Sequence, residues 1–159
     1  MIGPSNVETQ TAGRSRFWSV VLSGYLRGVP TPLMRSAWRR NDELPFSEVI
    51  VVGRRSGRER RLLLNLIEVD GRRFIGHPNG AAQWTHNLAA ARSCTLIDRT
   101  GRAERVHARE ITAPADRDLI IEATTRLPAP TGRIYRAAGS HIRAAGRYFE
   151  LTPAAEPES

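Results

Sequence analysis

The stretch from Glu48 to Ile67 decides the fold of this chain. It reads Glu48-Val-Ile-Val-Val52, then Gly53-Arg-Arg-Ser-Gly-Arg-Glu-Arg-Arg61, then Leu62-Leu-Leu-Asn-Leu-Ile67. Two apolar, β-type runs flank a link that contains two glycines, and this pattern predicts a β-hairpin. The link carries five arginines, which repel one another unless an anion lies among them. Guanidinium groups match the geometry of phosphate and carboxylate, and glycines let backbone N–H groups approach such a ligand. The link therefore predicts an anion-binding turn.

Further β-type runs lie on both sides of this hairpin, and turn signals join them. Asp70-Gly71 is a strong hairpin signal, and Thr100-Gly101 joins a second pair of runs. Six antiparallel strands are predicted, at 46–52, 60–69, 72–76, 93–99, 102–111 and 148–152.

Helices are predicted before the first strand and between later ones. They are expected at 14–27, 33–40, 81–91, 115–127 and 133–144. Alternating βαβ units are missing from the pattern, so a doubly wound parallel sheet is excluded in favour of an α+β domain built on a barrel. We expect flexible residues at 1–13, a single domain at 14–153 and a flexible tail at 154–159.

The composition suits one globular domain with a strongly basic surface. The chain has 159 residues, of which 40% are hydrophobic, and a net charge of +8. All 24 of its Lys and Arg residues are arginine. The strongly basic surface favours nucleic acid, anionic lipid or a polyanionic ligand as partner. Its single cysteine, Cys94, is expected to be a small buried hydrophobe in a reduced, cytoplasmic setting. No run approaches the roughly 20 apolar residues that span a bilayer, and residues 1–10 lack the features of a secretion signal.

Two motifs in this order resemble a known family. The first motif is Gly53-Arg-Arg-Ser-Gly-Arg-Glu-Arg60 with its hairpin, and the second is Asn79-Gly80 leading to Trp84-Thr-His-Asn-Leu88. Together they resemble the deazaflavin-dependent nitroreductases. The resemblance extends over about residues 17–153. It implies a split β-barrel related to the FMN-binding barrels, with an N-terminal helix and inserted short helices. It also implies hydride transfer from reduced 8-hydroxy-5-deazaflavin (coenzyme F420) to a quinone, a nitro compound or an activated alkene.

The resemblance also implies which residues form the site. Those expected to bind the cofactor are Arg55, Ser56, Gly57, Arg60, Asn65, Asn79, Trp84 and Asn87. Among them the turn residues would hold phosphate and carboxylates, Trp84 and Asn87 would flank the cofactor, and Asn65 would point toward its ring. Tyr135 is the candidate proton donor, although solvent would also serve. Nitroreducing family members carry several tyrosines in this C-terminal stretch, which here retains only Tyr135.

Alternatives remain open at the level of sequence. The arginine-rich link is also typical of a solvated basic hairpin. The same barrel could bind FMN, or could be a non-catalytic carrier of an apolar or acidic ligand.

A nucleic-acid partner is not expected, because the aromatic residues do not alternate with arginines along a strand. The four histidines form no metal-ligand cluster, so no metal is expected. The 17–26 segment packs against the barrel or contacts an anionic membrane, and the protein is a monomer or a homodimer.

Overall fold

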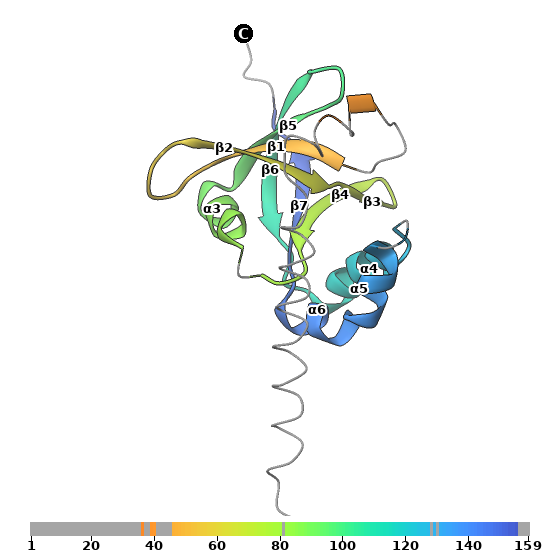
Figure 1. Cartoon of the computed structure of the whole chain (residues 1–159). Helices are drawn as coiled ribbons and strands as arrows, with labels where there is room; N and C mark the ends of the chain where they lie inside the picture. Colours follow the sequence, from red (N-terminus) through yellow and green to blue (C-terminus); the bar gives the residue numbers. More distant parts are fainter. Residues whose placement is uncertain are drawn as a thin grey trace, which may run out of the picture.

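The structure is a computed structural model that describes residues 36, 39–40, 46–80, 82–127, 129 and 131–155. The expected flexible residues 1–13, the helix expected at 14–27 and most of the helix expected at 33–40 lie outside these residues, as do residues 156–159 of the tail expected at 154–159. Element labels below follow Figure 1.

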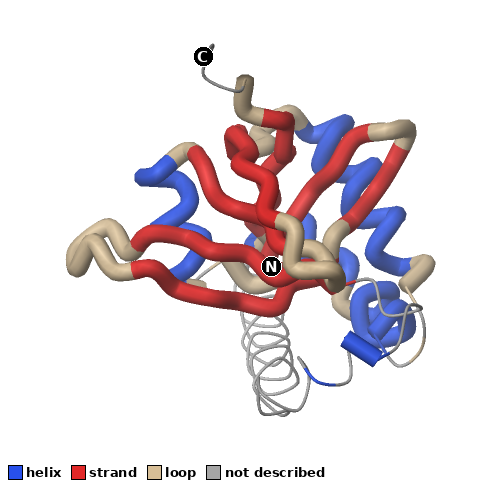
Figure 2. The backbone as a smooth tube through the Cα atoms, turned by 90° about the horizontal axis from the view of Figure 1, so that it is seen from above, coloured by secondary structure: helices blue, strands red, loops and turns tan. Residues whose placement is uncertain are grey.

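The described chain is organised around one curled antiparallel sheet (Figures 1 and 2). Its neighbouring strands pair in the order β2-β1-β5-β6-β7-β4-β3. The seven strands are β1 (Phe46–Val52), β2 (Glu59–Asn65), β3 (Ile67–Val69), β4 (Arg72–His77), β5 (Ser93–Ile97), β6 (Ala103–Glu110) and β7 (Arg147–Pro153). The α+β split-barrel prediction is confirmed, with seven strands instead of about six.

The additional strand arises within the run predicted as one strand at 60–69. This run divides at Leu66 into β2 and β3, which lie at opposite edges of the sheet. A single short run therefore carries the chain from one edge of the sheet to the other. Such a connection requires the two edges to be close in space, so it accounts for the curled shape of the sheet.

The two predicted turn signals have the backbone that their residues favour. Asp70 and Gly71 both have positive φ, at 51° and 72°, which matches the type I′ turns of two-residue hairpins. Gly101, between β5 and β6, has φ of 86°. Glycine adopts this backbone without the steric cost that other residues incur.

Four helices are described, and they cover opposite faces of the sheet (Figure 1). Helix α3 (Gln83–Ala91) lies on one side, and α4 (Pro114–Thr125), α5 (Thr131–Ala137) and α6 (Gly139–Ala145) form a group on the other. The single helix predicted at 133–144 is divided at Ala138 into α5 and α6. Pro114 stands in the first turn of α4, where the missing N–H costs nothing.

Strand alternation produces two separate apolar cores. The inner cluster lies under α3 and consists of Val49, Val51, Ile75, Trp84, Leu88, Cys94, Leu96, Val106, Ala108, Phe149 and Leu151. The outer cluster lies under α4–α6 and consists of Ile67, Phe74, Ile111, Ile120, Ile121, Tyr135, Ala138, Ile142 and Tyr148. The consecutive residues Tyr148 and Phe149 belong to different clusters, as the two-residue period of a strand requires. Cys94 is buried as predicted, and burial raises the pKa of its thiol to about 12.

Candidate anion and cofactor site

Residues 53–58, here called the arginine turn, form a compact link between β1 and β2. The N–H of Gly53 donates to the carbonyl of Arg58 at 2.8 Å, and the N–H of Gly57 donates to the carbonyl of Gly53 at 2.9 Å. Ser56 Oγ accepts from the N–H of Arg58 at 3.3 Å. Gly57 has φ of 66°. Ser56 and Gly57 therefore shape the turn, and the Gly57 N–H is already used within it.

The arginines in and next to this turn differ in their charge partners. Arg61 lies 3.7 Å from the buried carboxylate of Glu48. Among the described residues, no carboxylate lies within ion-pair distance of Arg55, Arg58 or Arg60, and all three are exposed. These three, here called the unpaired arginines, concentrate positive charge at one end of the hairpin.

The strand register separates Arg60 from Arg61. Arg60 pairs with Val51 and Arg61 with Ile50, so the two side chains belong to opposite faces of the sheet. Because Val51 belongs to the inner cluster, Arg60 lies on the face that α3 covers. Of these two arginines, the sequence predicted only Arg60 as a cofactor-binding residue. The strand register places Arg60 on the same face of the sheet as Trp84.

Helix α3 contacts the arginine turn directly. The Arg54 guanidinium donates to Asn87 Oδ1 at 2.8 Å and to Gln83 Oε1 at 3.1 Å. The backbone N–H of Arg54 donates to the same Asn87 oxygen at 3.2 Å. The two motifs that define the family resemblance are thus joined in space. Arg54 was not among the predicted site residues, although it lies inside the first motif. Its two acceptors, Gln83 and Asn87, are four residues apart in the segment that contains the second motif.

Trp84 stands in the first turn of α3 and is 9% exposed. Its ring packs edge-on against His77, with centroids 6.4 Å apart, and tilted against Phe149, also at 6.4 Å. Nδ1 of His77 lies 3.0 Å from the backbone nitrogen of Asn79. The 77–80 loop is thereby fixed beside the tryptophan, next to the apolar interior of the half-barrel.

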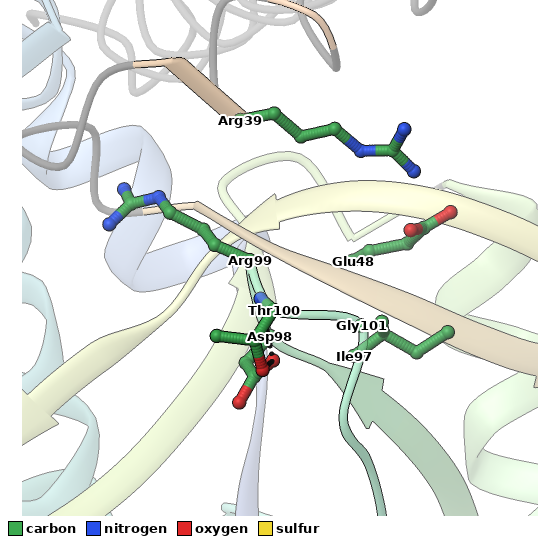
Figure 3. A pocket seen from close by; sticks show the side chains of 7 residues that line it. All are labelled: Arg39, Glu48, Ile97, Asp98, Arg99, Thr100 and Gly101. Carbon is green, nitrogen blue, oxygen red and sulfur yellow. Dashed lines mark hydrogen bonds between the residues drawn. The ribbon is translucent and has the colours of Figure 1, made fainter.

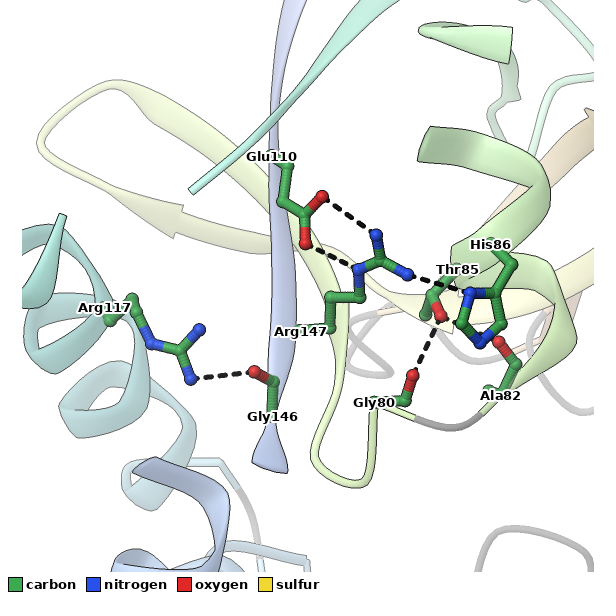
Figure 4. Close-up of polar contacts among 8 residues, drawn as sticks. All are labelled: Gly80, Ala82, Thr85, His86, Glu110, Arg117, Gly146 and Arg147. Atoms are coloured by element: carbon green, nitrogen blue, oxygen red, sulfur yellow. Dashed lines mark hydrogen bonds and ion pairs between the residues drawn. The ribbon is translucent and has the colours of Figure 1, made fainter. Parts of the chain in front are cut away.

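A second arginine holds the other flank of α3 (Figure 4). Arg147 binds both carboxylate oxygens of Glu110, at 2.5 and 3.0 Å, and donates to His86 Nδ1 at 3.1 Å. The hydrogen bonds from Arg147 lower the pKa of Glu110. In the loop before the helix, the N–H of Gly80 donates to the carbonyl of Ala145 at 2.8 Å. Helix α3 is therefore anchored to the sheet independently of the arginine turn.

The structure brings most of the predicted site residues into one region. Arg55, Ser56 and Gly57 lie in the arginine turn, and Arg60 follows it at the start of β2. Arg54 links the turn to Asn87, and Trp84 lies one helical turn before that asparagine on α3. Asn79 belongs to the loop that leads into α3.

Asn65 and Tyr135 lie away from this region. Asn65 is the last residue of β2, at the end far from the arginine turn, and pairs with Phe46. Its side chain lies on the opposite face of the sheet from that of its neighbour Leu64, which packs against the inner cluster. Tyr135 is 5% exposed and belongs to the outer cluster. In that cluster the Tyr148 hydroxyl has no hydrogen-bond partner among the described residues, and burial raises its pKa well above the usual value.

A pocket of about 310 Å³ lies at the other end of β1, beside the β5–β6 turn (Figure 3). It is lined by Arg39, Glu48, Ile97, Asp98, Arg99, Thr100 and Gly101. The Asp98 carboxylate accepts from Thr100 Oγ1 at 2.6 Å, and this bond is the main cause of its lowered pKa. The Asp98 carboxylate therefore stabilises the turn between β5 and β6. None of the residues that line the pocket belongs to the two motifs.

Comparisons with known proteins show the fold. No family model matches the sequence, and no curated protein matches it. A protein solved as a domain-swapped dimer is similar at 17% identity and a TM-score of 0.55, over 91% of this chain and 99% of that chain. HutZ, the heme storage protein from Vibrio cholerae, is similar at 14% identity and a TM-score of 0.51, over 79% and 91%. An F420-H2-dependent reductase (FDR-A) aligns at 20% identity over 68% of this chain and 94% of that chain, with a TM-score of 0.48.

These similarities and the strand order define an α+β split barrel. A heme storage protein shares this architecture, so the fold alone does not specify the chemistry. Among the described residues, no helix is long and apolar enough to cross a membrane. The same part of the chain contains no group of three or more His, Cys, Asp or Glu residues that could hold a metal ion.

Proposed function

We propose that this protein is a split-barrel oxidoreductase that binds reduced coenzyme F420 between the arginine turn and α3. The cofactor would supply a hydride to a quinone, a nitro compound or an activated alkene. One observation carries the proposal: three arginines that have no carboxylate partner among the described residues stand in and directly after a turn that is bonded to the helix of Trp84. The two sequence motifs agree with this arrangement.

The charge of the turn favours a ligand with several negative charges. The ion-paired arginines of β4, β6 and β7 each contact a glutamate, as Arg73 does with Glu104 at 2.8 and 2.9 Å. Arg55, Arg58 and Arg60 neutralise nothing in the described chain. A deazaflavin with a phosphate and an acidic tail matches three guanidinium groups better than the single phosphate of FMN. FMN is therefore the second candidate.

Each chain residue in the proposal has a limited task. Arg55 and Arg60 would hold phosphate and carboxylates, while Ser56 and Gly57 keep the turn in shape. Trp84 and the apolar interior beside it would exclude water from one side of the cofactor, which favours hydride transfer over side reactions. We assign no role to Tyr135 or Asn65, and the proton for the product would come from solvent.

Turnover with the reduced cofactor tests the proposal. Purified protein mixed with reduced F420 and menadione should oxidise the cofactor, which is followed by its absorbance. The double variant Arg55→Ala/Arg60→Ala should lose this activity at low cofactor concentration. Arg126→Ala removes one exposed arginine on another face and is the matched control. Absence of turnover with menadione, a nitroaromatic and an activated alkene would contradict the proposal.

The alternatives give different results in the same preparation. An FMN enzyme would purify yellow and release FMN on denaturation. A non-catalytic carrier would bind a fatty acid tightly and show no affinity for either cofactor. We further propose a cytoplasmic protein that acts as a monomer or homodimer on a small-molecule acceptor; light scattering of the purified protein distinguishes the two assemblies.

A further inference from the structure

We infer that Arg54 is a positioning residue: it fastens the arginine turn to α3 and so holds the unpaired arginines in one place. This inference rests on the proposed function of the turn, and it assigns Arg54 a task different from that of its neighbours. Arg54 would not hold the ligand. It would fix the groups that do.

The contact has the geometry of a fastening. The two terminal nitrogens of one planar guanidinium reach Asn87 Oδ1 at 2.8 Å and Gln83 Oε1 at 3.1 Å. Gln83 and Asn87 are four residues apart, so their side chains lie on one face of α3. The backbone N–H of Arg54 also donates to Asn87, at 3.2 Å. Main chain and side chain of the same residue are thus held by one helix face.

The acceptors are neutral, and this sets Arg54 apart from the arginines of the sheet. Arg73 and Arg147 are each held by a glutamate, which cancels their charge. Two amide oxygens hold Arg54 without cancelling any charge. The turn therefore gains a fixed position while its positive potential is retained. A carboxylate in either place would fasten the turn equally well but would weaken its attraction for an anion.

The fastening also opposes a force within the turn. Arg54, Arg55 and Arg58 lie within five residues of one another, and their like charges repel. Without the contact to α3, this repulsion would spread the hairpin end. The ligand would then have to order the turn as it binds, and the ordering lowers affinity. Asn87 uses Oδ1 for this contact, which leaves its Nδ2 group to donate to the ligand.

Three variants separate positioning from a merely structural role. Arg54→Ala removes the contact, Arg54→Lys keeps the charge but loses the planar fork, and Gln83→Glu keeps the contact while adding a negative charge. Two quantities are measured for each: the amide hydrogen exchange of residues 53–58 without ligand, and the affinity for oxidised F420 from its fluorescence. Arg126→Ala serves as the control, and thermal unfolding checks that each variant is folded.

The three variants should give different combinations. Arg54→Ala should accelerate exchange in the turn and weaken F420 binding about tenfold or more. Arg54→Lys should fall between this variant and the wild type, because an ammonium group cannot reproduce the fork. Gln83→Glu should leave exchange unchanged and still weaken F420 binding several-fold. That last combination is one that loss of structure cannot produce.

Each contrary result identifies what is wrong. Unchanged turn exchange in Arg54→Ala would overturn the inference, and so would faster exchange with unaltered F420 affinity. Unweakened binding in Gln83→Glu would refute the role of the neutral acceptors. Failure of the wild type to bind F420 would instead defeat the proposed function, while the exchange measurement would still decide whether Arg54 positions the turn.

Discussion

Two populations of arginine in this molecule have opposite electrostatic surroundings. On β4 and β7, Arg72, Arg73 and Arg147 each contact a carboxylate at 3.2 Å or less. In and beside the arginine turn, Arg55, Arg58 and Arg60 contact none in the described chain. The same residue type therefore serves to join strands in one region and leaves a concentrated positive charge in the other.

The difference shows why net charge is a poor guide to function. The paired arginines add to the count of basic residues, but glutamates offset them locally. Glu150, for example, is held by both Arg72 and Arg109, and the hydrogen bond from Arg72 is the main cause of its lowered pKa. In the described chain, Arg55, Arg58 and Arg60 lie within six residues of one another without such an offset, so this part of the surface attracts anions locally.

Removal of two unpaired arginines should have the largest effect. Arg55→Ala/Arg60→Ala should weaken F420 binding by about 3–6 kcal/mol, because each charged hydrogen bond contributes about 1.5–3 kcal/mol. Thermal stability should stay close to that of the wild type, since neither side chain has a carboxylate partner to lose in the described part of the chain. Fluorescence titration and calorimetry give the two quantities. A large loss of stability would show that these arginines belong to the structural population after all.

Removal of a paired arginine should have the reverse pattern. Arg147→Ala leaves Glu110 and His86 without their shared donor and removes the cation from above the Phe149 ring, 5.8 Å from its centroid. We expect a loss of about 1–2 kcal/mol in the free energy of unfolding, because the pair is only partly buried. Denaturant unfolding measures the change. Glu110→Gln keeps an oxygen acceptor for Arg147, so it should lower the free energy of unfolding by less than Arg147→Ala. Equal losses in the two variants would contradict a stabilising role for the contacts that Arg147 makes besides the one to Glu110.

The paired population should also make stability depend on pH. Arginine contacts lower the pKa of Glu104, Glu110 and Glu150 from the usual value of 4.5. A carboxylate whose pKa is lower in the folded state stabilises the fold above its unfolded pKa, and this contribution is lost as pH falls through the folded value. The melting temperature should therefore fall progressively below about pH 5. Glu150→Gln should show a shallower fall, and an acid-insensitive melting temperature would refute the pairing.

An exposed ion pair provides the smallest expected effect. Arg126 contacts Glu122 at 2.7 Å, but the two side chains are 74% and 64% exposed. Arg126→Ala should change the free energy of unfolding by about 0.5 kcal/mol or less. It should not alter F420 affinity beyond the small effect of one distant charge. A marked loss of affinity would mean that net charge, and not the arginine turn, attracts the ligand.

Local sequence signals were sufficient for most of the sheet. The turn at 53–58, Asp70-Gly71 and Thr100-Gly101 each join the strands that they predict, because a positive φ at glycine is a local requirement. The division of the 60–69 run at Leu66 was not predictable in this way. It depends on which edge of the sheet each half joins, and that is decided by distant strands.

The candidate site was predictable in part for the same reason. The motifs contain the residues that meet, but the contact between Arg54 and Asn87 joins residues 33 positions apart and depends on how α3 packs. Tyr135 was chosen for its chemistry, whereas its place in the outer cluster follows from the packing of α5. The role of each of the five arginines likewise depends on strand register, which separates Arg60 from Arg61.

The most direct test of the central claim compares two ligands that share one ring system. Oxidised F420 and the same deazaflavin without its phosphate and acidic tail are titrated into the wild-type protein at equal ionic strength. If the unpaired arginines hold the acidic portion, F420 binds far more tightly than the truncated ring, and its advantage shrinks as salt is added. Equal affinity for the two ligands would show that the arginine turn does not hold the cofactor.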